Sequence, residues 1–315
     1  MFRLGLVGAG RMGRTHLRAL DPSSEVSVVA IAEPFAPSRE AVGDGGAVLH
    51  ESVDAMLDAG GLDGVLIAAP TGLHPALVAQ IAEAGLPILC EKPGGFTVDD
   101  VRAAAAAAER HGVPLQYAYW RRYVPALGAL RERVAGGDMG DALLVSSSQW
   151  DESPPAPGFR ATSGGIFVDM AVHEFDQVRW ITGQEYGELE VAASPLRDDP
   201  DLTNDVDSAH AIATMSQGTV AFISVGRHHA GGDLVRLELF GTRGAASETF
   251  IDHRRDGDAP QMDALRRQAE GFAAFARGGT CTGATVEDAV AALAAAQRAT
   301  AAVPGLGRIP IASSA

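Results

Sequence analysis

The chain has 315 residues, of which 46% are hydrophobic, and this length is enough for two domains with separate cores. Its net charge of −15 argues against a nucleic-acid or anionic-membrane partner, because both require a basic surface. A strand-like segment starts at Phe2, no apolar run is long enough to span a bilayer, and Cys90 and Cys281 form no metal-binding pattern. We therefore expect a cytoplasmic protein without a signal peptide, with both cysteines as free thiols.

The first 120 residues alternate short apolar runs with Ala-rich helical stretches. The runs are continuously apolar, which is typical of parallel strands covered on both faces. Strands are predicted at 2–7, 26–32, 64–69, 86–91 and 114–119, and helices at 11–20, 38–42, 52–58, 74–84 and 98–110. This alternation predicts an α/β domain with a doubly wound parallel sheet over residues 1–120.

From residue 121 the pattern changes to a series of strands with few helices between them. Helices are predicted at 124–135 and 173–182, and strands at 142–150, 188–194, 206–216, 219–227 and 233–240. This order predicts an α+β domain with a large open, mainly antiparallel sheet over residues 121–315. The last two predicted helices, 263–277 and 285–302, are expected to pack back against the first domain.

A GxGxxG motif spans Gly8–Gly13, directly after a predicted strand and before a predicted helix. Its glycines allow a pyrophosphate to approach the backbone, and the helix N-terminus attracts the negative charge. Glu33 ends the second strand, where a carboxylate accepts from ribose hydroxyls and repels a 2′-phosphate, whereas the nearby Arg39 opposes this preference. The pattern predicts a Rossmann domain that binds NAD rather than NADP, and the alternative is a turn beside a surface glutamate. The expected contacts are Gly8, Gly10, Arg11, Met12, Gly13 and Glu33.

Two further segments follow predicted strands at their carboxyl ends, where open α/β sheets bind ligands. Pro70, Thr71 and His74 follow the strand at 64–69 and are expected near the nicotinamide, although His74 could equally be a helix-start residue without a ligand. Glu91 and Lys92 follow the strand at 86–91. A lysine beside a positively charged nicotinamide in a partly dry cleft can exchange protons near neutrality, and the alternative is a surface lysine in a turn.

Asp169, His173 and Asp176 are spaced i, i+4 and i+7, so they share one stripe of a predicted helix whose other residues are largely apolar. Ionisable groups on a buried helix usually form pairs, bind metal or take part in chemistry. One alternative is that Asp169 caps the helix and His173 satisfies a core partner. Another is a divalent-metal site formed by all three, which the nearby Lys92 would oppose.

These motifs together resemble the Gfo/Idh/MocA family of oxidoreductases over nearly the whole chain. The resemblance rests on GxGxxG, on Thr71-x-x-His74, on Glu91-Lys92-Pro93 and on Asp169-x-x-x-His173, and the segment 163–176 is most similar to the myo-inositol 2-dehydrogenase branch. It implies an NAD(P)-dependent enzyme acting on CH–OH groups, with Lys92, Asp169 and His173 as catalytic residues and Asp176 binding substrate hydroxyls. It also implies a cis peptide before Pro93 and a homodimer or homotetramer formed through the second sheet.

Oxidation of a secondary alcohol by NAD needs a base for the hydroxyl proton and a positive group for the developing alkoxide. His173 suits the base, oriented by Asp169, and Lys92 suits the positive group, but the two roles can be exchanged. The predicted function is oxidation of a cyclitol or sugar hydroxyl to a ketone. A regulator that senses dinucleotide or sugar without catalysis is the alternative, and three intact catalytic residues weigh against it.

The sequence predicts the catalytic residues more specifically than the residues that bind substrate. Inositol dehydrogenases tend to carry a Tyr-Gly-Tyr-Asp-like stretch where residues 227–233 read Arg-His-His-Ala-Gly-Gly-Asp. This departure leaves the polyol open, including an aldose or a modified sugar. Arg122, Trp150 and Asp151 are expected to contact the substrate, together with Lys92, Asp169, His173 and Asp176.

Overall fold

The computed structural model describes residues 1–43, 45–194 and 205–303, and the chain divides into two units. The first unit contains residues 1–123 and 261–290, and the second contains residues 124–260 and 291–315. The first unit therefore includes a C-terminal segment as well as the N-terminal part of the chain.

The first unit is built on a six-stranded parallel sheet in the order β3-β2-β1-β4-β5-β6. Its strands are β1 (Phe2–Val7), β2 (Val26–Ala32), β3 (Val48–His50), β4 (Gly64–Ile67), β5 (Ile88–Cys90) and β6 (Leu115–Tyr117). The strands that follow β1 in the chain, β2 and β3, lie on one side of it, and β4, β5 and β6 lie on the other side. The order of strands therefore reverses between the neighbours β1 and β4. Ligands of doubly wound sheets bind at this switch point, outside the carboxyl ends of the strands. The predicted doubly wound sheet is confirmed, and the three-residue β3 is an additional strand.

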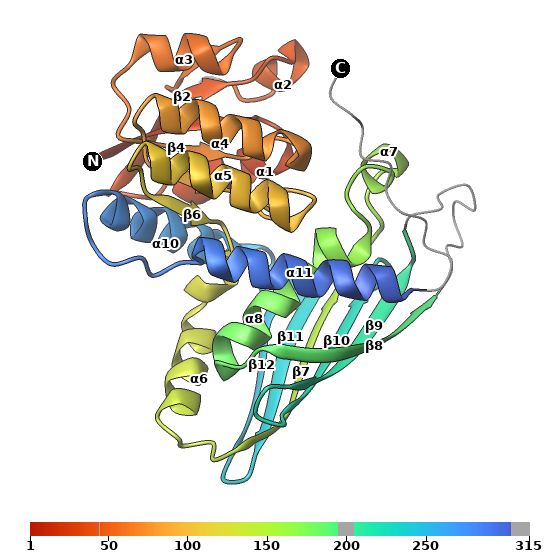
Figure 1. The fold of residues 1–315 in the computed structure, drawn as a ribbon. Coiled ribbons are helices and arrows are strands. Elements are labelled where there is room, and N and C mark those ends of the chain that lie inside the picture. Colours follow the sequence, from red (N-terminus) through yellow and green to blue (C-terminus); the bar gives the residue numbers. More distant parts are fainter. Residues whose placement is uncertain (44, 195–204, 304–315) are drawn as a thin grey trace. The chain divides into compact units, whose positions relative to one another are not determined.

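Helices cover the sheet of the first unit, and α4 and α5 lie side by side (Figure 1). Phe272 of α10 meets the ring of Phe2 edge-on at 6.0 Å, in a hydrophobic core that also contains residues of β1, β2, β4 and β5. This helix therefore belongs to the core of the first unit. The helical segments are α1 (Arg11–Leu20), α2 (Ala36–Glu40), α3 (Val53–Ala59), η1 (Thr71–Leu73), α4 (His74–Glu83), α5 (Val98–Arg110), η2 (Trp120–Tyr123), α10 (Ala259–Ala276) and the start of α11 (Val286–Ala302).

The second unit is built on a six-stranded sheet in the order β12-β11-β7-β10-β9-β8. The strands are β7 (Ala142–Trp150), β8 (Tyr186–Ser194), β9 (Ser208–Met215), β10 (Val220–Gly226), β11 (Leu234–Gly241) and β12 (Ala245–Asp252). Only the pair of β7 and β10 is parallel, which confirms the mainly antiparallel sheet. β12 was not predicted, because the sequence Ala-Ala-Ser-Glu-Thr-Phe-Ile-Asp has little hydrophobic alternation.

The two faces of this second sheet differ in burial. Along β9, Ala209, Ala211 and Ala213 are buried, whereas Ile212 between them is 47% exposed. Helix α8 lies on the face of the alanines, since Gln177 of α8 donates to Ser147 on the corresponding face of β7. The face of Ile212 is called the open face below. The helical segments are α6 (Pro125–Ala135), α7 (Pro157–Arg160), η3 (Phe167–Ala171), α8 (Val172–Thr182), α9 (His253–Asp256) and the rest of α11.

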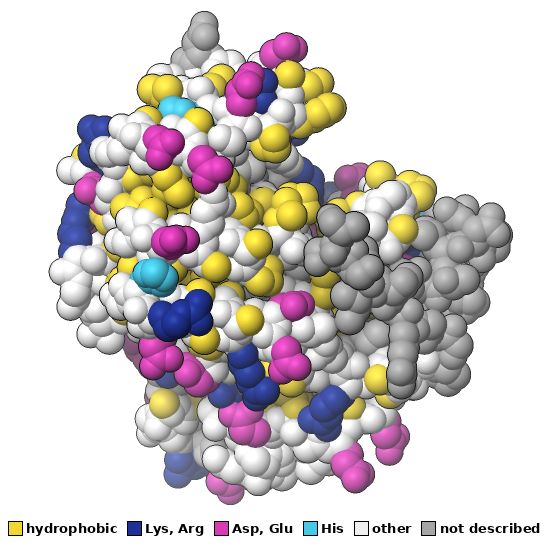
Figure 2. Space-filling model, turned by 45° about the horizontal axis from the view of Figure 1, so that its top comes forward, with side chains coloured by type: hydrophobic (Ala, Val, Ile, Leu, Met, Phe, Trp, Pro, Cys, Tyr) yellow, Lys and Arg dark blue, Asp and Glu magenta, His cyan; other side chains and the backbone are white. Residues whose placement is uncertain are grey.

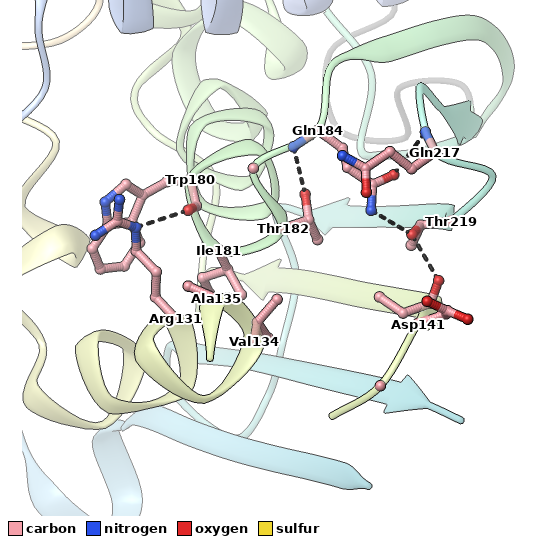
Figure 3. Close-up of a pocket in the computed structure, with 13 residues that line it drawn as sticks. Arg131, Val134, Ala135, Asp141, Trp180, Ile181, Thr182, Gln184, Gln217 and Thr219 are labelled. Atoms are coloured by element: carbon pink, nitrogen blue, oxygen red, sulfur yellow. Dashed lines mark hydrogen bonds between the residues drawn. The ribbon is translucent and has the colours of Figure 1, made fainter. Parts of the chain in front are cut away.

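A cavity of about 340 Å³ lies in the second unit beside the C-terminal ends of α6 and α8. Its polar groups bond to one another, as Figure 3 shows: the Gln184 amide donates to Thr219, and the Arg131 guanidinium donates to the backbone oxygen of Trp180. None of the site residues predicted from the sequence lines this cavity. Because its polar side chains pair with each other, we interpret it as part of the structural framework.

Two features of the molecule bear on its partners: the charged side chains on one face, and the lengths of the described helices. On the face shown in Figure 2, Lys and Arg side chains lie scattered among Asp and Glu side chains. Within the described ranges, no helix is both long and apolar enough to cross a bilayer. Both cysteines are free thiols.

Candidate active site

The loop between β1 and α1 in the first unit has the backbone shape that a dinucleotide requires. Gly8 has φ +95°, and a Cβ there would lie 2.7 Å from the carbonyl oxygen of Ala68. A Cβ at Gly10, by contrast, would meet no atom within 4 Å, so the loop is open on this side. Gly10 is also the N-cap of α1, whose first turn contains no acidic residue. The N–H groups of this turn and the positive end of the helix therefore fit a pyrophosphate.

Glu33 lies at the end of β2 and is tied to the glycine loop. Its Oε2 accepts from the backbone N–H of Ala9 at 2.7 Å, and its Oε1 accepts from the N–H of Phe35 at 2.9 Å. A carboxylate has about four lone-pair positions, so each oxygen can still accept from a ribose hydroxyl. The Glu33 side chain is thus held in place by two backbone N–H groups, and its ribose contact stays a prediction.

Arg39, the cation that opposed the preference for NAD, is already occupied. Its guanidinium donates to the backbone oxygens of Glu33 and Pro34 at 2.7 and 2.8 Å and to the carboxylate of Glu51 at 3.0 Å. These bonds use three of the five N–H groups of the guanidinium.

The strand end that carries Lys92 is connected to α1 by a buried pair that the sequence analysis did not identify. His16 Nε2 lies 2.7 Å from Glu91 Oε1, and the other oxygen of Glu91 accepts from the backbone N–H of Lys92 at 3.0 Å. Burial alone would raise the pKa of Glu91, but the hydrogen bond and charge of His16, together with Lys92, lower it. Glu91 is therefore a buried positioning group for the backbone of Lys92.

Lys92 is the only lysine of the chain, because the other 24 of its 25 basic residues are arginines. Arginine stays protonated in proteins, whereas a lysine can lose its proton and presents a compact charge. A chain that uses arginine at every other basic position keeps lysine here. This contrast indicates that position 92 favours a compact ammonium group over the larger guanidinium.

His74 lies at the first position of α4 and links two loops of the first unit. Its Nε2 lies 2.8 Å from the backbone oxygen of Ala69, and its Nδ1 lies 2.8 Å from that of Pro93. The side chain is 1% exposed, and burial lowers its pKa despite these two hydrogen bonds. The Lys92–Pro93 peptide is cis, as the resemblance implied. His74 therefore holds this loop from the inside, and Pro70 and Thr71 lie on the more exposed segment before it.

In the second unit, Asp169 lies in a π-helical turn and not in a regular α-helix. The turn η3 runs directly into α8, which carries His173 and Asp176, and two glycines with positive φ, Gly164 and Gly165, precede it. Single π-helical turns are rare and are often found at functional sites. The predicted spacing of the three side chains is kept along the chain, while the local geometry around Asp169 differs from the predicted one.

A buried network of charged side chains lies against Asp169, and its arginines were not predicted as site residues. Arg227 Nη1 lies 3.4 Å from Asp169 Oδ2, while its Nε and Nη2 lie 2.9 and 3.2 Å from the two oxygens of Asp205. Arg160 binds Asp205 at 2.8 Å and Asp207 at 3.3 Å. The Asp-x-Asp pattern at 205–207 places both carboxylates on one side of an extended segment, a signal that sequence analysis could have used.

Asp151 and Trp150, both predicted to contact substrate, lie in different environments. Burial raises the pKa of Asp151, and the nearby carboxylates of Asp233 and Asp169 add to this effect against Gln149 and Arg227. Asp151 therefore lies within electrostatic range of Asp169. Trp150, in contrast, has the strand position of the open face and donates to Ser224 at 3.3 Å, so within the second unit it points away from the face on which α8 lies. Trp150 stays a predicted substrate contact, on the sheet face opposite to α8, because successive strand residues point to opposite faces.

Arg122, also a predicted substrate contact, is engaged inside the first unit. Its guanidinium donates to Asp288 at 2.9 Å and to the backbone oxygen of Gly283 at 3.4 Å, both inside the first unit, and its side chain is 4% exposed. The structure thus uses Arg122 to attach the 283–288 segment. The sequence could not show this, because the partner lies more than 150 residues away.

The alternative of a metal site at Asp169, His173 and Asp176 was tested against the geometry. Within residues 1–43, 45–194 and 205–303, no three His, Cys, Asp or Glu side chains form a group that could hold a metal ion. Asp169 instead faces the guanidinium of Arg227, whose positive charge opposes a cation at this carboxylate.

Comparison with known proteins was made for each part of the chain and for the whole. Residues 2–119 match the model of an oxidoreductase family with an NAD-binding Rossmann fold, and residues 128–247 match the model of the GFO/IDH/MocA C-terminal domain. The chain is 48% identical over 299 residues to the rhizopine catabolism protein MocA of Rhizobium meliloti, covering 95% of this chain and 94% of that protein.

Two further similarities concern proteins named as inositol dehydrogenases. The chain is 34% identical over 292 residues to the myo-inositol dehydrogenase Hyg17 of Streptomyces leeuwenhoekii, covering 88% and 89% of the two chains. The crystal structure of a myo-inositol dehydrogenase from Corynebacterium glutamicum ATCC 13032 is similar with a TM-score of 0.85 and 26% identity, over 96% of each chain. The similarity therefore extends over both units and nearly the full length.

Proposed function

The chain belongs to the Gfo/Idh/MocA family of oxidoreductases, and from this premise we propose that it is an NAD-dependent dehydrogenase oxidising a secondary hydroxyl of an inositol-like cyclitol to a ketone. The first unit binds the dinucleotide and the second unit binds the polyol. The observation that carries the chemistry is the position of Asp169 and His173, one helical turn apart where η3 meets α8. The names of the relatives support a cyclitol as substrate.

The choice of NAD over NADP rests on Glu33 and Arg39. Glu33 is held at the end of β2 by two backbone N–H groups, where a 2′-phosphate would meet its negative charge. Arg39 donates to two carbonyls and a carboxylate and is not poised to bind that phosphate. When bound, NAD supplies the acceptor for the substrate hydride.

The catalytic residues are proposed as Lys92, Asp169 and His173. His173, which is 7% exposed, takes the hydroxyl proton. Asp169 orients the imidazole of His173 and places a negative charge beside it. Lys92 stabilises the negative charge that develops on the substrate oxygen. Asp176 and Asp151 bind further hydroxyls of the polyol, and their carboxylates select the carbon presented for oxidation.

We further propose that two copies associate through the open face of the second sheet. This face carries the exposed apolar side chains of Ile212, Val220 and Phe240, which are 47%, 38% and 45% exposed. They lie on three adjacent or near-adjacent strands, β9, β10 and β11. An apolar patch on a sheet face is typical of a homo-oligomer interface.

The test is reduced-nicotinamide absorbance with purified protein, NAD or NADP, and a panel of inositols, aldoses and amino- or deoxy-sugars. Turnover of an inositol with NAD supports the proposal in full. Turnover of an aldose or a modified sugar alone keeps the dehydrogenase and replaces its substrate, with residues 227–233 as the reason. Binding of NAD without turnover of any compound contradicts catalysis and favours a sensor.

A further inference from the structure

Arg227 is the largest fully buried side chain of the described residues, and it follows directly after β10. Its residue exposure is 0%, and its backbone N–H donates to the carbonyl of Asp207 at 2.8 Å. A guanidinium stays charged inside a protein and is costly to bury without carboxylate partners. The two carboxylates that lie against Arg227 are those of Asp205 and Asp169.

Asp205 fixes the orientation of this guanidinium. One edge of Arg227, formed by Nε and Nη2, faces the two oxygens of Asp205 at 2.9 and 3.2 Å, and both side chains are 0% exposed. Arg160 donates at 2.8 Å to Asp205 Oδ2, the same oxygen that lies beside Nε of Arg227. Arg227 Nη2 donates to Asp205 Oδ1, whereas Nε makes no hydrogen bond within the described residues; because a guanidinium is planar and rigid, this contact on one edge leaves Nη1 for another acceptor.

The remaining nitrogen, Nη1, points at Asp169. It lies 3.4 Å from Asp169 Oδ2, and the Asp169 side chain is 18% exposed, compared with 0% and 8% for Asp205 and Asp207. Asp169 is thus the carboxylate of this network that reaches toward solvent. It is also the one that lies in the π-helical turn, one turn before His173.

The charges of the network agree with this arrangement. Two guanidiniums, Arg160 and Arg227, face the two most buried carboxylates, Asp205 and Asp207, and balance them. Asp169 is a third carboxylate, to which Nη1 of Arg227 donates at 3.4 Å. His228, 44% exposed in its side chain, lies 3.6 Å from Asp207 at the rim.

We propose that Arg227, oriented by Asp205, is a positioning residue that holds the Asp169 carboxylate in the rotamer needed beside His173. This inference rests on the proposed function, because it assigns Arg227 a role through a proposed catalytic residue. It also gives a role to the first residue of the 227–233 segment, where this sequence departs from the inositol dehydrogenase pattern. Arg227 acts on the acid–base pair and does not touch the substrate.

The experiment compares R227Q, R227K and the matched control R160Q, with D169N and R227Q/D169N completing a double-mutant cycle. R160Q removes the other guanidinium from the same buried Asp205, so it reports the structural cost of disturbing the network. Thermal unfolding and far-UV circular dichroism show which variants are folded. Steady-state kinetics with NAD and the inositol turned over by the wild type then give kcat and KM separately.

A positioning role predicts a specific kinetic pattern. R227Q should lose about 30- to 100-fold in kcat with KM for the polyol and NAD within about threefold, because a misplaced catalytic group costs this much. R227K, which keeps the charge without the fork, should recover to within about tenfold of the wild type. R160Q should lower the Tm as R227Q does but lose at least about tenfold less kcat than R227Q, because Arg227 keeps its contacts with Asp205 and Asp169. In the D169N background, R227Q should cost less than about threefold, because residues that act as a unit are non-additive.

Three results would overturn the inference: R227Q with near wild-type kcat, R160Q losing as much kcat as R227Q, or a full further loss from R227Q in the D169N background. If R227Q does not fold, R227K decides with the same readouts and its own cycle with D169N. A wild type that turns over no polyol contradicts the proposed function, whereas an active wild type with an unaffected Arg227 variant contradicts only the role of Arg227.

Discussion

His16 Nε2 lies 2.7 Å from Glu91 Oε1, and both side chains are almost entirely buried. His16 belongs to α1, the helix that begins at the glycine loop, and Glu91 precedes Lys92 at the end of β5. The second carboxylate oxygen of Glu91 holds the backbone N–H of Lys92. One buried pair therefore connects the helix of the dinucleotide loop to the proposed catalytic lysine.

Replacing His16 by Ala is expected to destabilise the first unit by about 3 kcal/mol at neutral pH, because it leaves a buried carboxylate without its partner. The lowered pKa of Glu91 contributes stability that is present above the unfolded value of about 4.3 and lost as pH falls through the folded value. Without His16, burial raises this pKa instead, so the difference between wild type and H16A should shrink on acidification. Urea unfolding between pH 4 and 8 measures it, with exposed His111→Ala as control. A constant difference across this range would contradict the pairing.

Burial of His74 predicts a second effect of pH on stability, at higher pH than the effect of Glu91 in the wild type. Burial lowers its pKa in the folded protein, so below about 6.5 the unfolded chain binds a proton that the folded chain does not. The free energy of unfolding should therefore fall as pH drops below that value. His74→Gln removes this contribution, and the wild-type curve should be steeper than that of H74Q between pH 5 and 6.5. Identical slopes would show that His74 does not titrate with unfolding.

Glu33 is expected to set the cofactor preference. Glu33→Ala removes a carboxylate that accepts from the ribose hydroxyls, and hydrogen bonds to charged groups contribute about 1.5–3 kcal/mol, so NAD should bind roughly 10- to 100-fold more weakly. Affinity for NADP should change less or improve, since the repulsion of its 2′-phosphate is lost. Fluorescence titration with both reduced cofactors measures the ratio, and exposed Glu40→Ala serves as control. If the ratio of NAD affinity to NADP affinity is the same in E33A as in the wild type, Glu33 does not set the cofactor preference and only holds the backbone of Ala9.

Features formed by residues that are close together in the sequence were predicted, whereas features formed by residues far apart in the sequence were not. The glycine loop, Glu33 and the 169–176 stripe are local patterns, and each was found from spacing alone. The pairs of His16 with Glu91 and of Asp169 with Arg227 join residues 75 and 58 positions apart, which no periodicity connects. The π-helical turn at Asp169 was also not predictable, because i, i+4 spacing fits an α-helix equally well. The surroundings of Trp150 and Arg122 were not predictable either, because strand parity and a partner in the 283–288 segment decide them.

The proposed dimer through the open face predicts that one charge on this face separates the subunits. Ile212→Glu places a carboxylate among the exposed apolar side chains of β9, β10 and β11, where a partner would have to bury it unpaired. Light scattering coupled to size exclusion should then show a monomer where the wild type shows a dimer or a larger assembly. Leu73→Glu, at a 52% exposed residue of the first unit, is the matched control and should leave the mass unchanged. A monomeric wild type would refute the interface.

The single lysine makes it possible to decide between Lys92 and His173 as proton acceptor. Protein labelled with ¹⁵N-lysine contains one side-chain Nζ signal, which reports Lys92 without mutation. If His173 is the base and Lys92 the positive group, Lys92 should stay protonated across the pH range of activity. K92R should then keep part of kcat, whereas His173→Gln should lose about 10²- to 10⁴-fold. A Lys92 signal that titrates together with the acid limb of kcat/KM, with K92R as inactive as Lys92→Met, would exchange the two roles. Near wild-type turnover by both K92M and H173Q would remove both residues from the mechanism.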